Sequence, residues 1–301
     1  MPMIQRQALS LYQTIHKIIL PYLYNVMSTI RFFLILVVSI CLSSTVCVQA
    51  DTRSADTTTT KQVEELATDR PDQTESSTVV PQGALQVETG IVFERERGDN
   101  TRMSHIEHTA LGTTLVRYGL LPSLELRFIG EFHRQRNVYF NEGDVVNEGL
   151  AESAVGVKIQ ICREEGIIPE TALNLHMRLP VGGEAFSVKT PVPDFRFLCS
   201  HTLTEQLSLG YNLGAEFNGE EPSAEFVYTC TIGYALTEQI ETYIEAFGSK
   251  PCNETLTCTI DGGISYLLTP LVKIDASAGV GLTAGAPSYY LSTGLSFRLF
   301  K

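Results

Sequence analysis

The sequence is poor in features that would mark a nucleic-acid-binding protein or a helical membrane protein. Tryptophan is absent from its 301 residues, and no apolar run after residue 50 is long enough for a membrane-spanning helix. Residues 1–50 contain neither Asp nor Glu, which leaves 19 basic residues against 34 acidic ones in the remainder. A net charge of −15 without any basic stripe argues against a nucleic-acid partner.

Paired metal-ligand spacings are also lacking. Five cysteines follow residue 50, and none of them belongs to a C-x-x-C pair, so a zinc site is not expected. Cys252 and Cys258 lie six residues apart around an expected loop and are candidates for a disulfide in an oxidising compartment. The histidines offer no defensible ligand set. We therefore predict neither a metal nor any other cofactor.

The N-terminus has the pattern of an export signal. After Met27, Arg31 supplies a positive charge and an apolar stretch covers residues 32–47. Val48-Gln49-Ala50 then places small residues at the −3 and −1 positions of a cleavage site. We predict translation from Met27 and cleavage after Ala50. The alternative is an uncleaved membrane anchor, for which the apolar stretch is somewhat short.

From Ala84 onward, apolar and polar residues alternate with a period of two. Val272 and Ile274, for example, alternate with Lys273 and Asp275. Alternation of this kind is typical of strands with one apolar face and one wet face. The pattern predicts twelve strands, over residues 84–95, 105–118, 124–136, 149–162, 169–181, 194–203, 206–218, 223–235, 239–249, 256–267, 271–282 and 288–300.

Short turns alternate with longer loops between these strands. Three of the turns share a Leu-Thr-x-x-apolar pattern, in which Thr204, Thr237 and Thr269 recur at intervals of 33 and 32 residues. Outer-membrane barrels have the same asymmetry, with short periplasmic turns and longer outer loops. We therefore predict an all-β fold, an antiparallel transmembrane β-barrel of twelve strands. The longer loops are expected at 96–104, 137–148, 182–193, 218–222, 250–255 and 283–287.

A soluble β-sandwich is the alternative fold, because its strands also alternate. The expected strands, however, exceed the usual five or six residues and are long enough to cross a bilayer when tilted. Their polar faces mix Gly, Ala and Ser with charges of both signs, as a confined lumen requires. The barrel is therefore favoured.

The wet faces of the strands define the side chains that would line the lumen. Fixed charges there would set the selectivity of a pore, whereas the alternative is an ion-pair network that fills and stiffens a closed barrel. The sequence does not decide between these two interpretations. The candidates are Glu125, Arg127, Glu131, His133, Lys158, His176, Arg178, Arg196, Glu241, Glu245, Lys273, Asp275 and Arg298.

The last expected strand carries a second pattern. Gly294, Phe297 and Leu299 follow the order polar, x, Gly, x, x, aromatic, x, hydrophobic. This order resembles the terminal signal of bacterial outer-membrane barrels, which the barrel-assembly machinery reads. The departure from it is that Phe300 and Lys301 follow, where many such proteins stop at an aromatic residue.

A charged segment precedes the first strand. The run "TDRPDQTESSTVVPQGALQVETG" (68–90) resembles the opening of the outer-membrane β-barrel family named "putative MetA-pathway of phenol degradation", and the ending "STGLSFRLF" is similar as well. The resemblance implies a channel for small organic molecules. Four charged residues of the segment are candidates for a plug or gate, and the alternative is a solvated periplasmic tether. They are Asp69, Arg70, Asp72 and Glu75.

Three regions follow: an N-terminal extension and signal peptide (1–50), a polar periplasmic segment with the candidate plug (51–83), and an outer-membrane barrel (84–301). We expect passive passage of small aromatic or otherwise apolar solutes, without catalysis. The expected partners are the lipid bilayer, the assembly machinery and the solute. The alternatives are a filled, structural barrel and an outer-membrane phospholipase-like enzyme, which would need a Ser beside a His on the lipid-facing wall. His201 lies on that face, but no matching Ser, His and Asn motif accompanies it.

Overall fold

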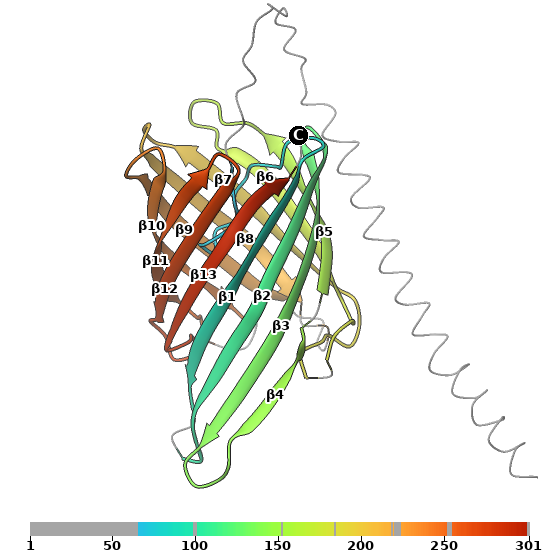
Figure 1. Ribbon diagram of the computed structural model, residues 1–301, viewed down its shortest axis with the longest axis vertical. Coiled ribbons are helices and arrows are strands. Elements are labelled where there is room, and N and C mark those ends of the chain that lie inside the picture. Colours follow the sequence, from blue (N-terminus) through green and yellow to red (C-terminus); the bar gives the residue numbers. More distant parts are fainter. Residues whose placement is uncertain are drawn as a thin grey trace, which may run out of the picture. The chain divides into compact units, whose positions relative to one another are not determined.

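The computed structural model describes residues 66–98, 101–151, 153–183, 185–217, 219, 224–251 and 255–299. Within these ranges, no helix is long and apolar enough to cross a membrane. The described chain folds into β1 (Leu85–Arg97), β2 (Met103–Leu121), β3 (Leu124–Tyr139), β4 (Val145–Leu150), β5 (Ser153–Cys162), β6 (Glu170–Leu179), β7 (Val192–Thr202), β8 (Leu207–Phe217), β9 (Ala224–Ala235), β10 (Ile240–Lys250), β11 (Thr259–Thr269), β12 (Val272–Gly281) and β13 (Tyr289–Leu299) (Figure 1).

These elements close into an antiparallel barrel of twelve strands, as predicted. Sequence neighbours pair in order, and β1 pairs with β13 from Leu85 opposite Leu299 to Arg95 opposite Tyr289. β4 and β5 both pair with β3 and are two parts of one strand. Pairing of the first strand with the last satisfies backbone N–H and C=O groups for which lipid has no partners.

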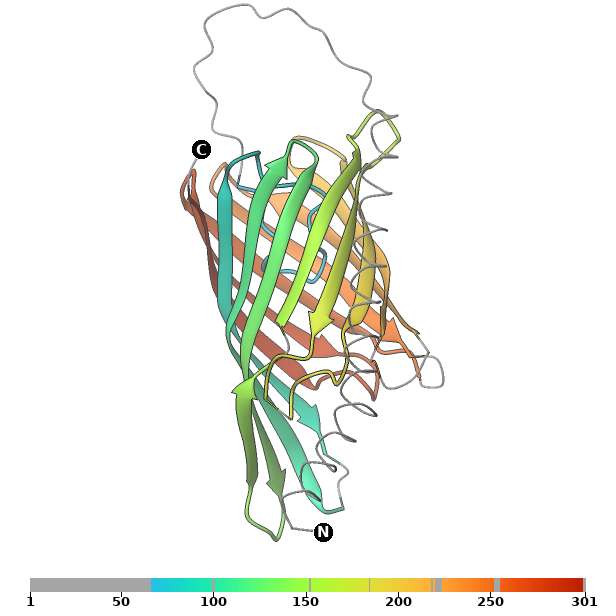
Figure 2. The same ribbon diagram turned by 90° about the vertical axis from the view of Figure 1, so that its right-hand side faces the viewer.

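The strand boundaries differ from the expected ones mainly in β2, β3 and β4. The loops expected at 96–104 and 137–148 are reduced to 98–102 and 140–144, and these strands run beyond their neighbours (Figure 2). Arg136 illustrates the reason, since it pairs across the hairpin with Asp144 at 2.6 Å and with Glu107 at 3.3 Å. Residues 133–137 of β3 are all polar, so the apolar alternation that marks the other strands is lost there.

Most of the short turns lie at one end of the barrel, the turn end, and most of the longer loops at the other, the loop end. The exception at the turn end is the connection 163–169 between β5 and β6. The recurring threonines explain two of the turns. Thr204 Oγ1 accepts hydrogen bonds from the N–H groups of Gln206 and Leu207, and Thr237 does the same for residues 239 and 240. A hydroxyl that accepts bonds from the backbone two and three residues on stabilises a tight turn.

The outer face of the barrel is apolar over its middle. Ile91, Phe128, Ile244, Ile264 and Leu291 each expose 48–55% of their surface. An apolar band of this size in contact with water would be unusual for a monomeric soluble protein. The band is therefore the surface that faces lipid.

The inner face holds the opposite kind of residue. Glu88, Arg117, Glu125, Lys158 and Asn174 are fully buried inside the barrel. Charges in such an interior are tolerated only when they are paired and hydrogen-bonded. The core of this molecule is thus a polar network, and its partners identify the candidate site.

The lipid-facing band predicts a depth-dependent cost for charge. Ile264→Arg, in the middle of β11, should destabilise the barrel by about 2–4 kcal/mol, because an arginine there must leave the hydrocarbon region or carry water into it. Leu282→Arg, at the loop end, is the matched control and should cost about 0–1 kcal/mol. Urea unfolding in lipid vesicles measures both. Equal losses for the two variants would contradict this placement of the band.

Candidate functional site

Residues 66–83 form a re-entrant segment inside the barrel. The segment lies within the half of the barrel nearest the turn end and returns to that end before β1 (Figure 2). Ala84 N–H donates to the Pro81 carbonyl at 3.0 Å, and Gly83 has a φ of 80°, the conformation that the third position of a type II turn requires. Residues 81–84 therefore form the turn that leads the segment into β1.

Asp69 lies at the centre of the largest ion-pair cluster. Its carboxylate accepts bonds from Lys158 Nζ at 2.9 and 3.0 Å and from Arg127 Nη1 at 2.6 Å, and Arg117 Nη1 lies 3.5 Å away. Burial alone would raise the pKa of Asp69, but the charges of Arg117, Lys158 and Arg127 hold it well below its usual range. Asp69 is therefore ionised within the lumen.

The strands do not balance these three cations by themselves. Arg117 pairs with Glu88 at 3.0 Å and with Glu125 at 2.9 Å, and Arg127 pairs with the same Glu125 oxygen at 2.9 Å. Two strand carboxylates thus face Arg117, Arg127 and Lys158. Two further carboxylates, Asp69 and Glu75, are brought in by the segment.

Arg70 binds the opposite wall of the lumen. Its Nη2 and Nε donate to the two carboxylate oxygens of Asp275 at 3.0 and 3.3 Å, and its Nη2 donates to Ser292 Oγ at 2.9 Å. The guanidinium lies against Gly90 and Gly294, which face each other across β1 and β13. A bidentate arginine–carboxylate pair fixes both the position and the plane of the group.

The next residues of the segment are hydrogen-bonded to β8 and β10. Gln73 N–H donates to Glu245 Oε2 at 2.7 Å, and the hydroxyl of Thr74 donates to the other oxygen of the same carboxylate. Glu75 N–H donates to Asn212 Oδ1 at 2.7 Å, and its carboxylate accepts from Arg127 Nη2 at 2.8 Å. The segment is therefore bound on all sides rather than resting on one wall.

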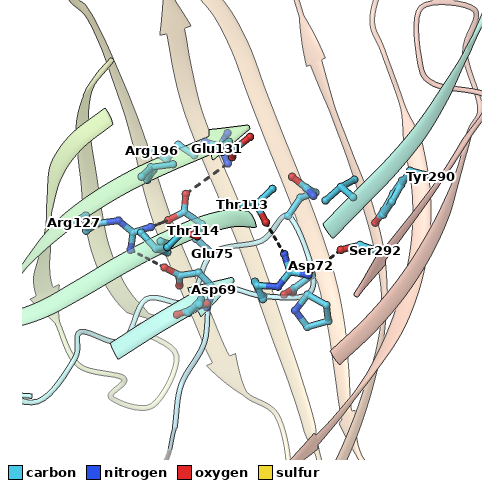
Figure 3. Close-up of a pocket in the computed structure, with 17 residues that line it drawn as sticks. Asp69, Asp72, Glu75, Thr113, Thr114, Arg127, Glu131, Arg196, Tyr290 and Ser292 are labelled. Atoms are coloured by element: carbon cyan, nitrogen blue, oxygen red, sulfur yellow. Dashed lines mark hydrogen bonds and ion pairs between the residues drawn. The ribbon is translucent and has the colours of Figure 1, made fainter. Parts of the chain in front are cut away.

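Cavities lie on both sides of the segment. Those towards the loop end measure about 300 and 340 Å³, and those towards the turn end about 420 and 730 Å³. Arg70, Pro71 and Asp72 line both the 300 Å³ and the 420 Å³ cavity. A partition only one chain thick thus separates them. Figure 3 shows Asp69 and Glu75 pointing towards Arg127 on one side of this region, and Thr113 and Ser292 on the other.

The lumen candidates from the sequence divide into two groups. Glu125, Arg127, Lys158, Arg196, Glu245 and Asp275 contact the segment directly. The rest have partners on the strands. Glu131 pairs with His133, Arg178 with Asp194, and Glu241 with Lys273, while His176 accepts from Arg127 and Arg298 donates to Gln86. A role in selectivity stays a prediction for all thirteen.

Arg117 is the most central residue that the sequence does not reveal. The register of β2 shifts between Leu111 and Thr114, where Gly112 has a φ of 61°. This bulge inverts the alternation, so that inward positions are even before it and odd after it. The only signal in the sequence is a glycine between threonine and leucine residues, which is too weak to place a bulge.

The assembly signal, the disulfide and the export signal remain predictions. Gly294 faces the lumen, while Phe297 and Leu299 lie in outward register, and their reading by the assembly machinery is still a prediction. Cys258 is a free thiol and Cys252 lies outside the described residues, as does the export signal at 1–50. In the part of the chain that is described, no three His, Cys, Asp or Glu residues form a metal site.

Residues 68–299 match the family described as "Putative MetA-pathway of phenol degradation". The chain belongs to this family, which confirms the resemblance seen in the sequence. No curated protein matches the sequence.

Among solved structures, an outer-membrane channel from Pseudomonas putida F1 has a TM-score of 0.57 at 12% identity, over 76% of this chain and 99% of that one. Two further structures have lower TM-scores. The NalP autotransporter translocator domain from Neisseria meningitidis has a TM-score of 0.49 at 8% identity, over 73% of this chain and 90% of that one, and the NanC porin has a TM-score of 0.46 at 12% identity, over 71% of this chain and 100% of that one. Neither carries an argument about this chain. The likeness to the first establishes the fold alone. The chain is a β-barrel of the bacterial outer membrane, as predicted.

Two carboxyl groups of the segment predict opposite effects of pH. Burial, and then the charge of the Glu245 carboxyl, raise the pKa of Asp72 well above 3.8. Above about pH 4, Asp72 therefore releases a proton when the protein unfolds. The free energy of unfolding of the wild type falls as the pH rises through this range. Asp72→Asn has no such proton. The excess of its urea midpoint over that of the wild type should therefore grow as the pH rises above about 4.

Glu75→Gln is the matched control on the same segment. Burial raises the pKa of Glu75, but Arg127 lowers it further, and the net shift is downward from 4.5. The ionised form therefore stabilises the wild type above the unfolded pKa, and this contribution is lost as the pH falls. Glu75→Gln should be less stable than the wild type near neutrality and approach it in acid. A pH-independent difference for both variants would contradict these charge assignments.

Proposed function

We propose that this member of the phenol-degradation family is a passive outer-membrane channel for small, aromatic or otherwise apolar solutes, and that residues 66–83 act as its gate. The observation that supports the gate is the partition at Arg70, Pro71 and Asp72, which lines cavities on both of its sides. A solute that travels along the lumen must pass this point. A displacement of the segment by about the width of one chain would join the two cavities.

The size and lining of the outer cavities support the solute class. Val92, Leu115 and Ile129 line one side of the 300 Å³ cavity, and Ile129, Ala154 and Phe186 line part of the 340 Å³ cavity. An apolar cavity of about 150 Å³ in another protein holds benzene. A single-ring solute therefore fits in either cavity by volume. Its apolar body would lie against these side chains, and the charged residues that line the rest of each cavity would face its edge.

The charges of the two walls support passive passage. Arg127 and Arg196 stand on one side of the segment, and Glu245 and Asp275 stand on the other. Fixed charges of this kind act on whatever enters the lumen without any coupled reaction. The mechanism that we propose uses no cofactor and forms no covalent bond.

A filled barrel without transport is the second candidate, because the segment is so fully bonded. Asp69 alone contacts three cations, and Arg70 contacts both an aspartate and a serine of the wall. We propose no catalytic role. On the lipid-facing wall, His201 Nε2 lies 3.5 Å from the hydroxyl of Tyr211, so its partner is a tyrosine and not a serine.

We also propose that residues 1–50 are removed during export and that residues 84–301 form the membrane-embedded part. N-terminal sequencing of the protein recovered from outer membranes tests the first half of this proposal. A chain that begins at Asp51 agrees with it, and a chain that retains residues 27–50 favours the membrane anchor instead.

Single-channel conductance of the refolded barrel in a planar bilayer tests the gate. Deletion of residues 66–83 should raise the conductance several-fold, because it removes the partition and connects the cavities. Deletion of residues 51–65, which precede the segment, is the control and should leave the conductance unchanged.

If the deletion variant fails to refold, Asp69→Ala combined with Arg70→Ala is a milder test, because it removes the two main charged contacts and keeps the chain length. Folded barrels of either kind that conduct no better than the wild type would contradict the gate and leave the filled barrel. Entry of a neutral single-ring solute into vesicles, measured on the same variants, tests the solute class.

A further inference from the structure

The guanidinium of Arg70 lies in a site, here called the seat, whose shape fits a planar cation. The seat is formed by Gly90, Gly294, Asp275, Ser292 and Thr113. A Cβ atom on Gly294 would lie 2.2 Å from Arg70 Nε, and one on Gly90 would lie 2.7 Å from Arg70 Cζ. Because these two glycines face each other across β1 and β13, the guanidinium lies directly on the backbone of the wall. Any side chain at either position would displace it.

The hydrogen-bond acceptors of the seat are arranged around the edge of the Arg70 guanidinium. The carboxylate of Asp275 accepts from Nη2 at 3.0 Å and from Nε at 3.3 Å, and Ser292 Oγ accepts from Nη2 at 2.9 Å. Thr113 Oγ1 lies 3.4 Å from Nη1. All three nitrogens of the guanidinium thus have an acceptor, and the fork of Nε and Nη2 matches the two carboxylate oxygens.

Asp275 differs from the paired carboxylates of the strands. Glu125 and Glu241 have cations on other strands of the wall, namely Arg117 on β2 for the first and Lys273 on β12 for the second. Within the described residues, the cation within ion-pair distance of Asp275 is Arg70, and the Asp275 side chain is only 1% exposed. When the segment is displaced, this carboxylate loses the cation that pairs with it, which favours a replacement cation at the same place.

We propose that Gly90, Gly294, Asp275 and Ser292 form a binding site for the guanidinium or amidinium group of a solute, and that Arg70 occupies this site as a built-in competitor. The 300 Å³ cavity adjoins the site and is lined by Thr113, Tyr290 and Ser292 among others, so it has room for the body of such a solute. A ligand of this class would take the place of Arg70 and favour the displaced segment. Binding at the site does not depend on whether the solute then crosses the membrane.

Chemical complementation of an Arg70→Ala barrel with methylguanidinium chloride tests the proposal. Isothermal titration calorimetry on the refolded protein in detergent should show saturable binding to Arg70→Ala and much weaker binding to the wild type, in which Arg70 competes for the seat. Arg70→Ala combined with Asp275→Asn should bind at least about tenfold more weakly, because the charged acceptor is lost. Arg70→Ala combined with Gly294→Ala should also lose binding, since the added methyl group fills the seat.

Methylammonium at matched ionic strength separates a guanidinium site from a general attraction for cations. It cannot occupy the fork of two acceptors, so its binding to Arg70→Ala should be much weaker. Equal binding of the two probes would overturn the proposal, as would equal binding of methylguanidinium to Arg70→Ala and to the Asp275→Asn double variant.

If Arg70→Ala does not refold, Arg70→Ser offers the same comparison with a short polar side chain that leaves the seat open. It leaves Asp275 without its cation, and binding of methylguanidinium should again disappear with Asp275→Asn. The readout is binding and not current. A barrel that binds methylguanidinium but does not conduct would therefore support this site while contradicting the channel.

Discussion

Three cations meet inside a closed barrel, and their neutralisation determines how the lumen is filled. Arg117, Arg127 and Lys158 come from three strands, whereas Glu88 and Glu125 are the strand carboxylates that face them. Leaving one charge of a buried cluster unpaired typically costs about 3–5 kcal/mol. The wall therefore favours a chain that carries further carboxylates into the interior, and the segment before β1 does so with Asp69 and Glu75.

The second charge of the segment determines its orientation. Asp69 and Arg70 are neighbours in sequence but bind opposite walls, the first on β3 and β5 and the second on β12 and β13. A half-turn of the segment about its own axis would place Asp69 against Asp275 and Arg70 against Lys158. Like charges would then meet on both sides, so a single orientation is strongly favoured. Because cations lie on one wall and carboxylates on the other, an electrostatic field runs across the lumen.

The sequence predicts the architecture well because the architecture depends on local periodicity. Twelve strands, their inward faces and the two kinds of connection all follow from alternation, and the inward position of Asp275 is among the results. Ion-pair partners are another matter, since Arg70 and Asp275 are 205 residues apart and their contact depends on the register of every strand between them. Arg117 is hidden for a local reason, the bulge at Gly112. The extension of β3 is hidden because residues 133–137, which lead into it, are all polar and show no alternation.

Because β1 pairs with β13, the Arg70 seat is built from the first and the last strands to be synthesised. Gly90 belongs to the first strand that the ribosome makes, whereas Ser292 and Gly294 belong to the last. Until β12 and β13 are made and β13 pairs with β1, Arg70 lacks its acceptors Asp275 and Ser292, so an open barrel cannot hold the segment in this way. The segment before the first strand thus acquires its final contacts only when the last strand is in place.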